Sequence, residues 1–125
     1  MKEFMVSLDV ETPPLSARQF MDCFGVEAKY FKVKKIRGKL LWRTESKLGF
    51  KTALKSHIKS IFRKTPLMNS SGPEKRSRYT PFLNVGVMYD SYTCTVDLPA
   101  ESIKLMTRHG VGIQLCCYPT DFEGK

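Results

Sequence analysis

Residues 79–118 read YTPFLNVGVMYDSYTCTVDLPAESIKLMTRHGVGIQLCCY, and this segment carries the clearest structural pattern in the chain. Apolar and polar residues alternate over positions 82–89 and again over positions 92–98, which is typical of half-buried strands. Asp90 and Ser91 lie between the two runs and suit a two-residue turn. The pattern therefore predicts a β-hairpin.

A helix and a last strand are predicted after this hairpin. Pro99 suits the first position of a helix, and Ile103 and Met106 give that helix an apolar face. Gly110 suits a left-handed helix end, and apolar residues at every second position from 111 to 117 predict the last strand. These residues predict packing, and none of them discloses an activity.

The N-terminal part carries similar signals. Alternation over residues 4–11 predicts a first strand. Ser16 and Gln19 match the capping-box pattern at the start of a short helix, which Gly25 ends. Residues 28–44 alternate again around a central turn, so they predict a second hairpin.

The longest predicted helix lies in the middle of the chain. Its apolar stripe faces the predicted sheet and consists of Leu54, Ile58, Ile61 and Phe62. Residues 65–78 combine turn-forming residues with basic ones, and they predict a flexible basic loop.

Two segments of the chain echo each other, because residues 7–26 and 95–111 both read as strand, capped helix, glycine and strand. A structural echo would give two halves that share one sheet with helices on one face, in a ferredoxin-like or related α+β sandwich. Helix-capping signals that arose independently in the two segments would give the same sequence pattern without any structural repeat. We predict a single domain over residues 1–125 with a mainly antiparallel sheet. The expected core is Val6, Leu8, Phe20, Phe24, Trp42, Leu54, Ile58, Ile61, Val85, Val87, Val96, Ile113 and Leu115.

Composition limits the class of protein. With 125 residues and 42% hydrophobic content, the chain can bury a core without a metal or a disulfide. The sequence contains no long apolar run, so we expect a soluble cytoplasmic protein without a membrane span. The four cysteines lack paired metal-binding spacing, and Cys116 and Cys117 would face opposite sides of a strand. We expect buried free thiols.

Charge is unevenly distributed along the chain. The formal net charge is +9, but residues 28–78 hold 16 of the 21 Lys and Arg residues and 2 of the 12 acidic ones. That segment therefore carries +14 and the remainder −5. The asymmetry predicts either a surface that steers an anionic partner or a solvated face that keeps the protein soluble.

The candidate binding residues come from this basic segment. The second hairpin supplies exposed basic and aromatic side chains, and the long helix carries a cation every four residues. Because no acidic residue lies between Lys47 and Lys64, a partner could supply the missing anions. The predicted partner-binding residues are Tyr30, Lys32, Lys34, Arg37, Lys51, Lys55, Lys59 and Arg63.

Catalytic motifs are absent from the sequence. His57 and His109 have no companion spaced for metal ligation or for activating a nucleophile. The sequence also lacks a phosphate-binding glycine loop and a nucleophile elbow. We therefore expect a binding protein rather than an enzyme, with no cofactor and no metal.

A family resemblance rests on the layout of the elements and on four short motifs. The motifs are Gly25-Val26, Leu41-Trp42, Leu98-Pro99-Ala100-Glu101 and Gly110-Val111-Gly112-Ile113-Gln114-Leu115. Over nearly its whole length the chain resembles small uncharacterised bacterial domains. These look like candidate immunity proteins of polymorphic toxin systems, including contact-dependent growth inhibition. The resemblance implies a protein that binds and blocks one toxin domain.

Two functions follow as hypotheses. Immunity proteins against basic nucleases tend to be acidic, so a basic one implies either a toxin with an acidic surface or a different function. The first hypothesis is an immunity protein that covers an acidic toxin surface. The second is a nucleic-acid-binding module, in which the cations contact phosphates while Tyr30, Phe31 or Trp42 stack on bases. Burial of Phe31 and Trp42 would weaken the second hypothesis.

Overall fold

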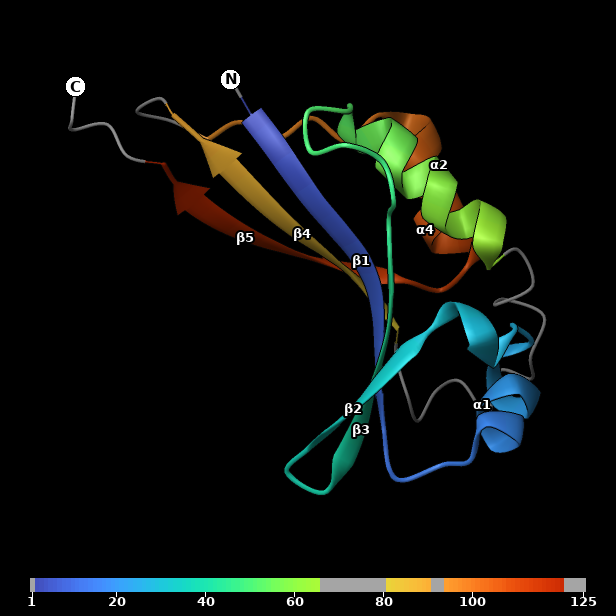
Figure 1. The fold of residues 1–125 in the computed structure, drawn as a ribbon. Helices are drawn as coiled ribbons and strands as arrows, with labels where there is room; N and C mark the ends of the chain where they lie inside the picture. Colours follow the sequence, from blue (N-terminus) through green and yellow to red (C-terminus); the bar gives the residue numbers. More distant parts are fainter. Residues whose placement is uncertain (1, 66–80, 91–93, 121–125) are drawn as a thin grey trace.

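The computed structural model describes residues 2–65, 81–90 and 94–120. These residues form a five-stranded sheet in the order β2-β3-β1-β4-β5, and the helices pack on one of its faces (Figure 1). The other face is uncovered by helices. The elements are β1 (Lys2–Thr12), α1 (Ala17–Phe24), the 3₁₀ helix η1 (Ala28–Tyr30), β2 (Lys32–Ile36), β3 (Lys39–Glu45), α2 (Leu54–Lys64), β4 (Phe82–Tyr89), α4 (Ala100–Arg108) and β5 (Gly112–Pro119).

The connectivity confirms the predicted α+β class. β1 pairs antiparallel with β3 and β4, and β2 pairs antiparallel with β3. The elements from β1 to β4 therefore follow the β-α-β-β-α-β order of a ferredoxin-like sandwich. α4 and β5 extend this unit, because β5 adds a parallel strand at the free edge of β4.

The predicted hairpin after β4 is wrong. Residues 94–99 form no strand, and the turn residue Ser91 lies outside the described residues. Both edges of β4 are already occupied, one by β1 and the other by β5, so the segment after β4 has no strand to pair with. It forms part of the crossover that parallel pairing requires.

The second half of the ferredoxin-like unit also differs from the sequence echo. The two halves are β1-α1-β2 and β3-α2-β4, whereas residues 95–111 belong to the added α4-β5 unit. Pro99 is the N-cap of α4 rather than its first residue, and Gly110 has the expected left-handed conformation with φ 64°. The predicted basic loop of residues 65–78 lies outside the described residues, except for Thr65.

α1 forms as its sequence predicts. The Ser16 hydroxyl accepts a hydrogen bond from the Gln19 backbone N–H at 3.1 Å, and the Gln19 side chain accepts one from the Ser16 N–H at 2.8 Å. Gly25 ends the helix with φ 68°. These caps satisfy backbone groups that have no partner within the helix.

Aromatic rings form the part of the core beneath α1. The Phe20 ring stacks on Trp42, with ring centroids 4.0 Å apart, and contacts Phe24 and Phe31 at 5.0 Å. The Trp42 indole N–H donates to Thr12 Oγ1 at 2.9 Å, so its one polar atom is satisfied inside the core. The Trp42 side chain points from β3 into the core, as predicted.

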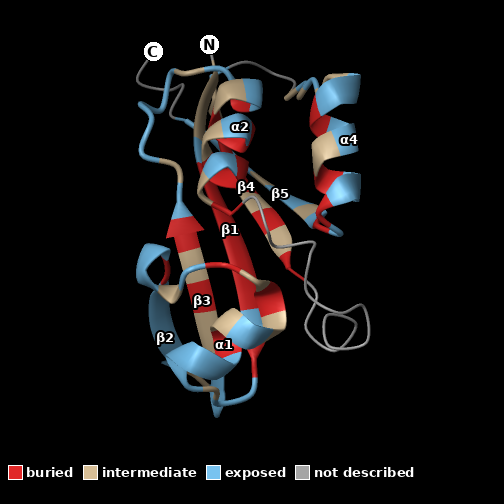
Figure 2. Ribbon diagram, turned by 90° about the vertical axis from the view of Figure 1, so that its right-hand side faces the viewer, coloured by how far each residue is buried: buried red, intermediate tan, exposed pale blue. Residues whose placement is uncertain are grey.

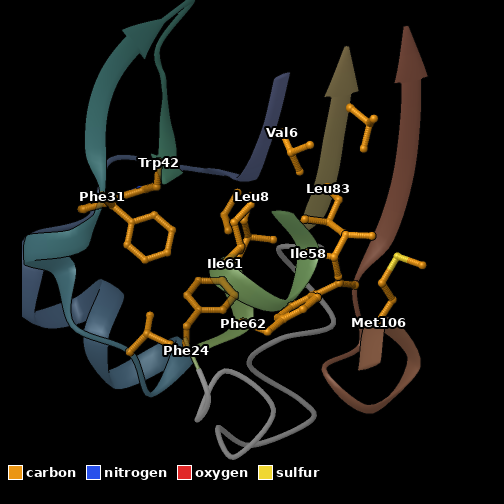
Figure 3. Close-up of a cluster of buried hydrophobic side chains, with 14 of the residues drawn as sticks. Val6, Leu8, Phe24, Phe31, Trp42, Ile58, Ile61, Phe62, Leu83 and Met106 are labelled. Carbon is orange, nitrogen blue, oxygen red and sulfur yellow. The ribbon is translucent and has the colours of Figure 1, made fainter. Parts of the chain in front are cut away.

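The remaining core lies beneath α2. Figure 3 shows Ile58 and Phe62 pointing from α2 toward Leu83 of β4 and Met106 of α4, and Ile61 lying beside Leu8 of β1. Ten of the thirteen predicted core residues are buried. Val96 and Ile113 are only half-buried and Leu115 is 44% exposed, because β5 is an edge strand and the segment before α4 is not part of the sheet. Among the described residues, no helix is long and apolar enough to cross a membrane.

Candidate functional site

A hollow of about 460 Å³ lies against the uncovered face of the sheet. It forms beside the N-terminal half of β1, beyond the point where β3 ends. There the loop of residues 46–53 runs along β1 instead, with the Ser46 N–H donating to the Val6 carbonyl at 2.9 Å and the Phe4 N–H to the Phe50 carbonyl at 2.8 Å. The loop thus supplies one wall of the hollow.

The rim of the hollow is apolar and exposed. The described residues include eight large apolar side chains that are exposed, and four of them line this one hollow: Met5, Leu48, Phe50 and Tyr118. Large apolar side chains gathered around a concavity on a protein surface mark a binding site.

Gly86 leaves room for two rim side chains to come together over β4. It lies between Met5 of β1 and Cys116 of β5 in the sheet register. A Cβ atom at position 86 would lie 3.3 Å from Met5 Cε and 3.4 Å from Tyr118 Cε2. The missing side chain therefore lets Met5 and Tyr118 approach each other over the strand.

A buried carboxylate lies beside the hollow. Asp9 belongs to β1 and points to the uncovered face, yet its side chain is only 2% exposed. It accepts hydrogen bonds from Ser7 Oγ at 2.8 Å and from Arg43 Nε and Nη2 at 2.9 and 2.8 Å, with Asn84 Nδ2 at 3.5 Å. This two-point contact orients the Arg43 guanidinium, which stays 39% exposed at the wall of the hollow.

The electrostatics of this pair follow from its geometry. The hydrogen bond to Asp9 is the main cause that raises the pKa of Arg43. Burial lowers this pKa, and electrostatic attraction to Asp9 and Glu45 raises it further. Arg43 therefore remains a fixed cation, held in one orientation at the site.

A serine–histidine contact lies at another wall. Ser46 Oγ is 2.6 Å from His57 Nδ1, and His57 is almost completely buried between α2 and β1, where its ring meets Phe4 edge-on. Burial lowers the pKa of His57, and the nearby backbone of Gly49 and Thr52 raises it by a smaller amount. No described carboxylate hydrogen-bonds to this imidazole, so we interpret the contact as a link between the 46–53 loop and α2.

The structure separates the predicted binding residues. Lys32 and Lys34 of β2 lie opposite Arg43 and Leu41, which puts them on the uncovered face beside the hollow. Arg37 is exposed in the turn after β2, with φ 50°. Tyr30 is exposed in η1, and the Lys29 ammonium lies 5.3 Å from its ring centre.

Of the other four predicted residues, Lys51 lies in the 46–53 loop and three belong to α2. Lys51 precedes α2, and Lys55, Lys59 and Arg63 are exposed on its outer side (Figure 2). Lys59 makes an ion pair with Glu101 of α4 at 3.5 Å. The predicted residues therefore do not form one surface: Lys32 and Lys34 make a basic patch on the uncovered face, and Lys55, Lys59 and Arg63 make another on α2.

Sequence patterns missed the centre of the site. Asp9 and Arg43 are 34 positions apart, and Asn84 is 75 positions from Asp9. One local signal was the carboxylate of Asp9, at a position where the strand pattern predicts an exposed side chain. Gly86 inside a strand was a second signal, because an interior strand glycine often marks a close approach.

Comparison of the chain with protein-family models, curated proteins and solved structures finds no match. The ferredoxin-like arrangement alone does not identify a function, because it hosts many unrelated ones. The function must therefore be inferred from the hollow and from the surfaces around it.

Proposed function

We propose that this chain is an inhibitory binding protein of the immunity type, which blocks a toxin domain by docking it on the uncovered face of the sheet. The observation that carries the proposal is the hollow, because its apolar rim, oriented arginine and neighbouring lysines match the composition of a protein-binding anchor site.

The rim supplies the binding energy. Met5, Leu48, Phe50 and Tyr118 expose apolar surface that a bound partner would remove from water. A partner side chain that enters the hollow also contacts the wall at Arg43. Because Asp9 already orients this guanidinium, little side-chain freedom is lost on binding.

The neighbouring lysines favour an acidic partner. Lys32 lies directly opposite Arg43 in the sheet, and like charges in this position repel. Neither Lys32 nor Lys34 makes an ion pair with another described residue. Carboxylates on the docked toxin would relieve the repulsion and speed association.

Nucleic acid is the weaker alternative. Phe31 is 7% exposed and Trp42 is 3% exposed, so neither ring can stack on a base in this fold. Of the three predicted stacking residues only Tyr30 is exposed, so a nucleic acid would depend mainly on phosphate contacts with the α2 cations, one of which already pairs with Glu101.

The experiment uses the toxin domain encoded by the gene next to this one. Phe50→Ala and Tyr118→Ala should each weaken binding by about tenfold or more, because rim aromatics act as anchors. Phe50→Ala keeps the backbone hydrogen bond from Phe4, so the loop stays in place. Ile103→Ala is the matched control, since Ile103 is equally exposed but lies on α4.

Charge reversal distinguishes the two basic patches. Lys32→Glu with Lys34→Glu should slow association and reduce its salt dependence, whereas Lys55→Glu with Arg63→Glu makes the same charge change on α2 and should have a smaller effect. If only the charge reversal on α2 weakened binding, the interface would lie on α2. If the neighbouring gene encodes no toxin and the protein protects cells from none, the immunity function is refuted.

A further inference from the structure

Two thiols approach each other at the end of the sheet where β1 begins and β5 ends. Cys94 lies in the segment before α4, Cys117 lies near the end of β5, and their sulfur atoms are 3.5 Å apart. All four cysteines are free, but Cys117 is exposed and the other three are half-buried. The expectation of buried thiols is therefore wrong, because an edge strand leaves the Cys117 side chain uncovered.

We propose that Cys94 and Cys117 form a reversible dithiol–disulfide site that reacts with low-molecular-weight disulfides of the glutathione class. The reaction goes beyond the proposed binding function and does not depend on it. It would join the crossover segment covalently to the edge strand β5.

The reaction balances through two exchanges. The Cys117 thiolate attacks one sulfur of the small disulfide, which forms a mixed disulfide and releases one small thiolate. The Cys94 thiolate then attacks the Cys117 sulfur and releases the second small thiolate. The protein loses two thiol protons and two electrons, and the small disulfide gains both as two thiols.

Exposure decides which sulfur reacts first. Cys117 is the accessible thiol, so the small disulfide meets it before Cys94. Burial raises the pKa of Cys94, the neighbouring Cys117 raises it further, and Lys2 lowers it. Cys94 is therefore the poorer first nucleophile, but its contact with Cys117 places it to complete the exchange.

The other two cysteines do not share this geometry. Cys116 is adjacent to Cys117 on β5, so its side chain points to the opposite face, where its sulfur lies 3.9 Å from Asn84 Oδ1. Cys23 belongs to α1, at the other end of the molecule (Figure 1). They provide an internal control, because both can be replaced without touching the proposed pair.

The test incubates the full chain with oxidised glutathione, quenches samples with acid and maps the products by mass spectrometry. The parent should lose two free thiols and yield one cross-linked peptide that joins residues 94 and 117. A variant with Cys23→Ser and Cys116→Ser should give the same product at the parent rate. Cys94→Ser should stop at a stable glutathione adduct on Cys117.

Three outcomes would overturn the proposal. One is a cross-link that involves Cys23 or Cys116, and another is a glutathione adduct on Cys117 that persists equally in the parent and in Cys94→Ser. The third is unchanged thiol loss in Cys117→Ser. Circular dichroism of each variant checks that the fold is intact, and reduction with excess dithiothreitol should restore both thiols to the parent.

Discussion

The core beneath α1 and the α4-β5 unit are built from similar sequence patterns but are buried to different extents. Both contain a helix followed by a left-handed glycine. Beneath α1, Phe20 and Phe24 are fully buried, whereas Leu115 of β5 and Ile103 of α4 remain 44% and 48% exposed. An alternating pattern therefore indicates which side of a strand a residue faces, but neighbouring elements decide whether that side is covered.

The position of each strand explains the contrast. β1 is central, with β3 and β4 on its two edges, and its inward side chains lie beneath α1 and α2. β5 has only β4 as a neighbour, and α4 buries only Ser102 and Met106. The ferredoxin-like unit is thus the deeply packed part of the molecule, and α4-β5 is a more loosely covered addition.

The largest effect should come from Phe20→Ala. This change removes the ring that stacks on Trp42 and contacts two other aromatic rings, so it should lower the free energy of unfolding by about 3–5 kcal/mol. Ile103→Ala in α4 should change it by less than about 0.5 kcal/mol, because Ile103 is half-exposed and alanine favours helix. Urea unfolding measures both, and equal losses would contradict the contrast between the two regions.

Burial should also decide how much stability is lost when either partner of the Asp9–Arg43 ion pair is removed. Arg43→Ala leaves the buried Asp9 carboxylate without its cation and should cost about 3–5 kcal/mol. Asp9→Ala leaves Arg43, which is already exposed enough to recover hydration, and should cost only about 1–3 kcal/mol. The measurement is urea unfolding at neutral pH. A larger loss for Asp9→Ala would show that exposure does not decide the cost.

The sequence predicted the features that depend on residues close together in the chain. The capping box of Ser16 and Gln19, the glycine end of α1 and the apolar stripe of α2 are confirmed because each acts within a few turns of helix. The α+β class is confirmed, but the ferredoxin-like prediction rested on the echo between residues 7–26 and 95–111, and the second half of that unit is β3-α2-β4 instead. The hairpin after β4 was wrong because strand pairing is non-local, and β5 took the edge of β4 that the hairpin needed.

The site was harder to predict than the fold. The predicted binding residues are exposed, but their distribution over both faces of the sheet depends on the sheet register and on which face the helices cover. The hollow itself combines the 46–53 loop with side chains from β1, β4 and β5, so no single segment carries its pattern. Leu48 and Phe50 lie in a loop and had no periodicity to reveal them.

A pH dependence should arise where α2 meets β1. The pKa of His57 is lowered in the fold, so the unfolded chain binds a proton at higher pH than the folded chain does. The contribution to stability is therefore full above the ordinary histidine pKa of about 6.5 and is lost as pH falls toward the folded pKa. Unfolding free energies measured from pH 7.5 down to pH 5 should decline less in His57→Gln than in the parent, and parallel declines would exclude His57 as the cause.

Leu115→Ala should have only a small effect on stability. Leu83 of β4 and Leu115 of β5 both face the helix layer from neighbouring strands, but Leu83 is fully buried and Leu115 is 44% exposed. Leu83→Ala should cost about 2–5 kcal/mol, because it leaves a cavity in the core. Leu115→Ala should cost less than about 1 kcal/mol, because water already reaches the side chain. A loss of several kcal/mol at Leu115 in urea unfolding would mean that β5 is covered in solution, which would remove the contrast between the two regions.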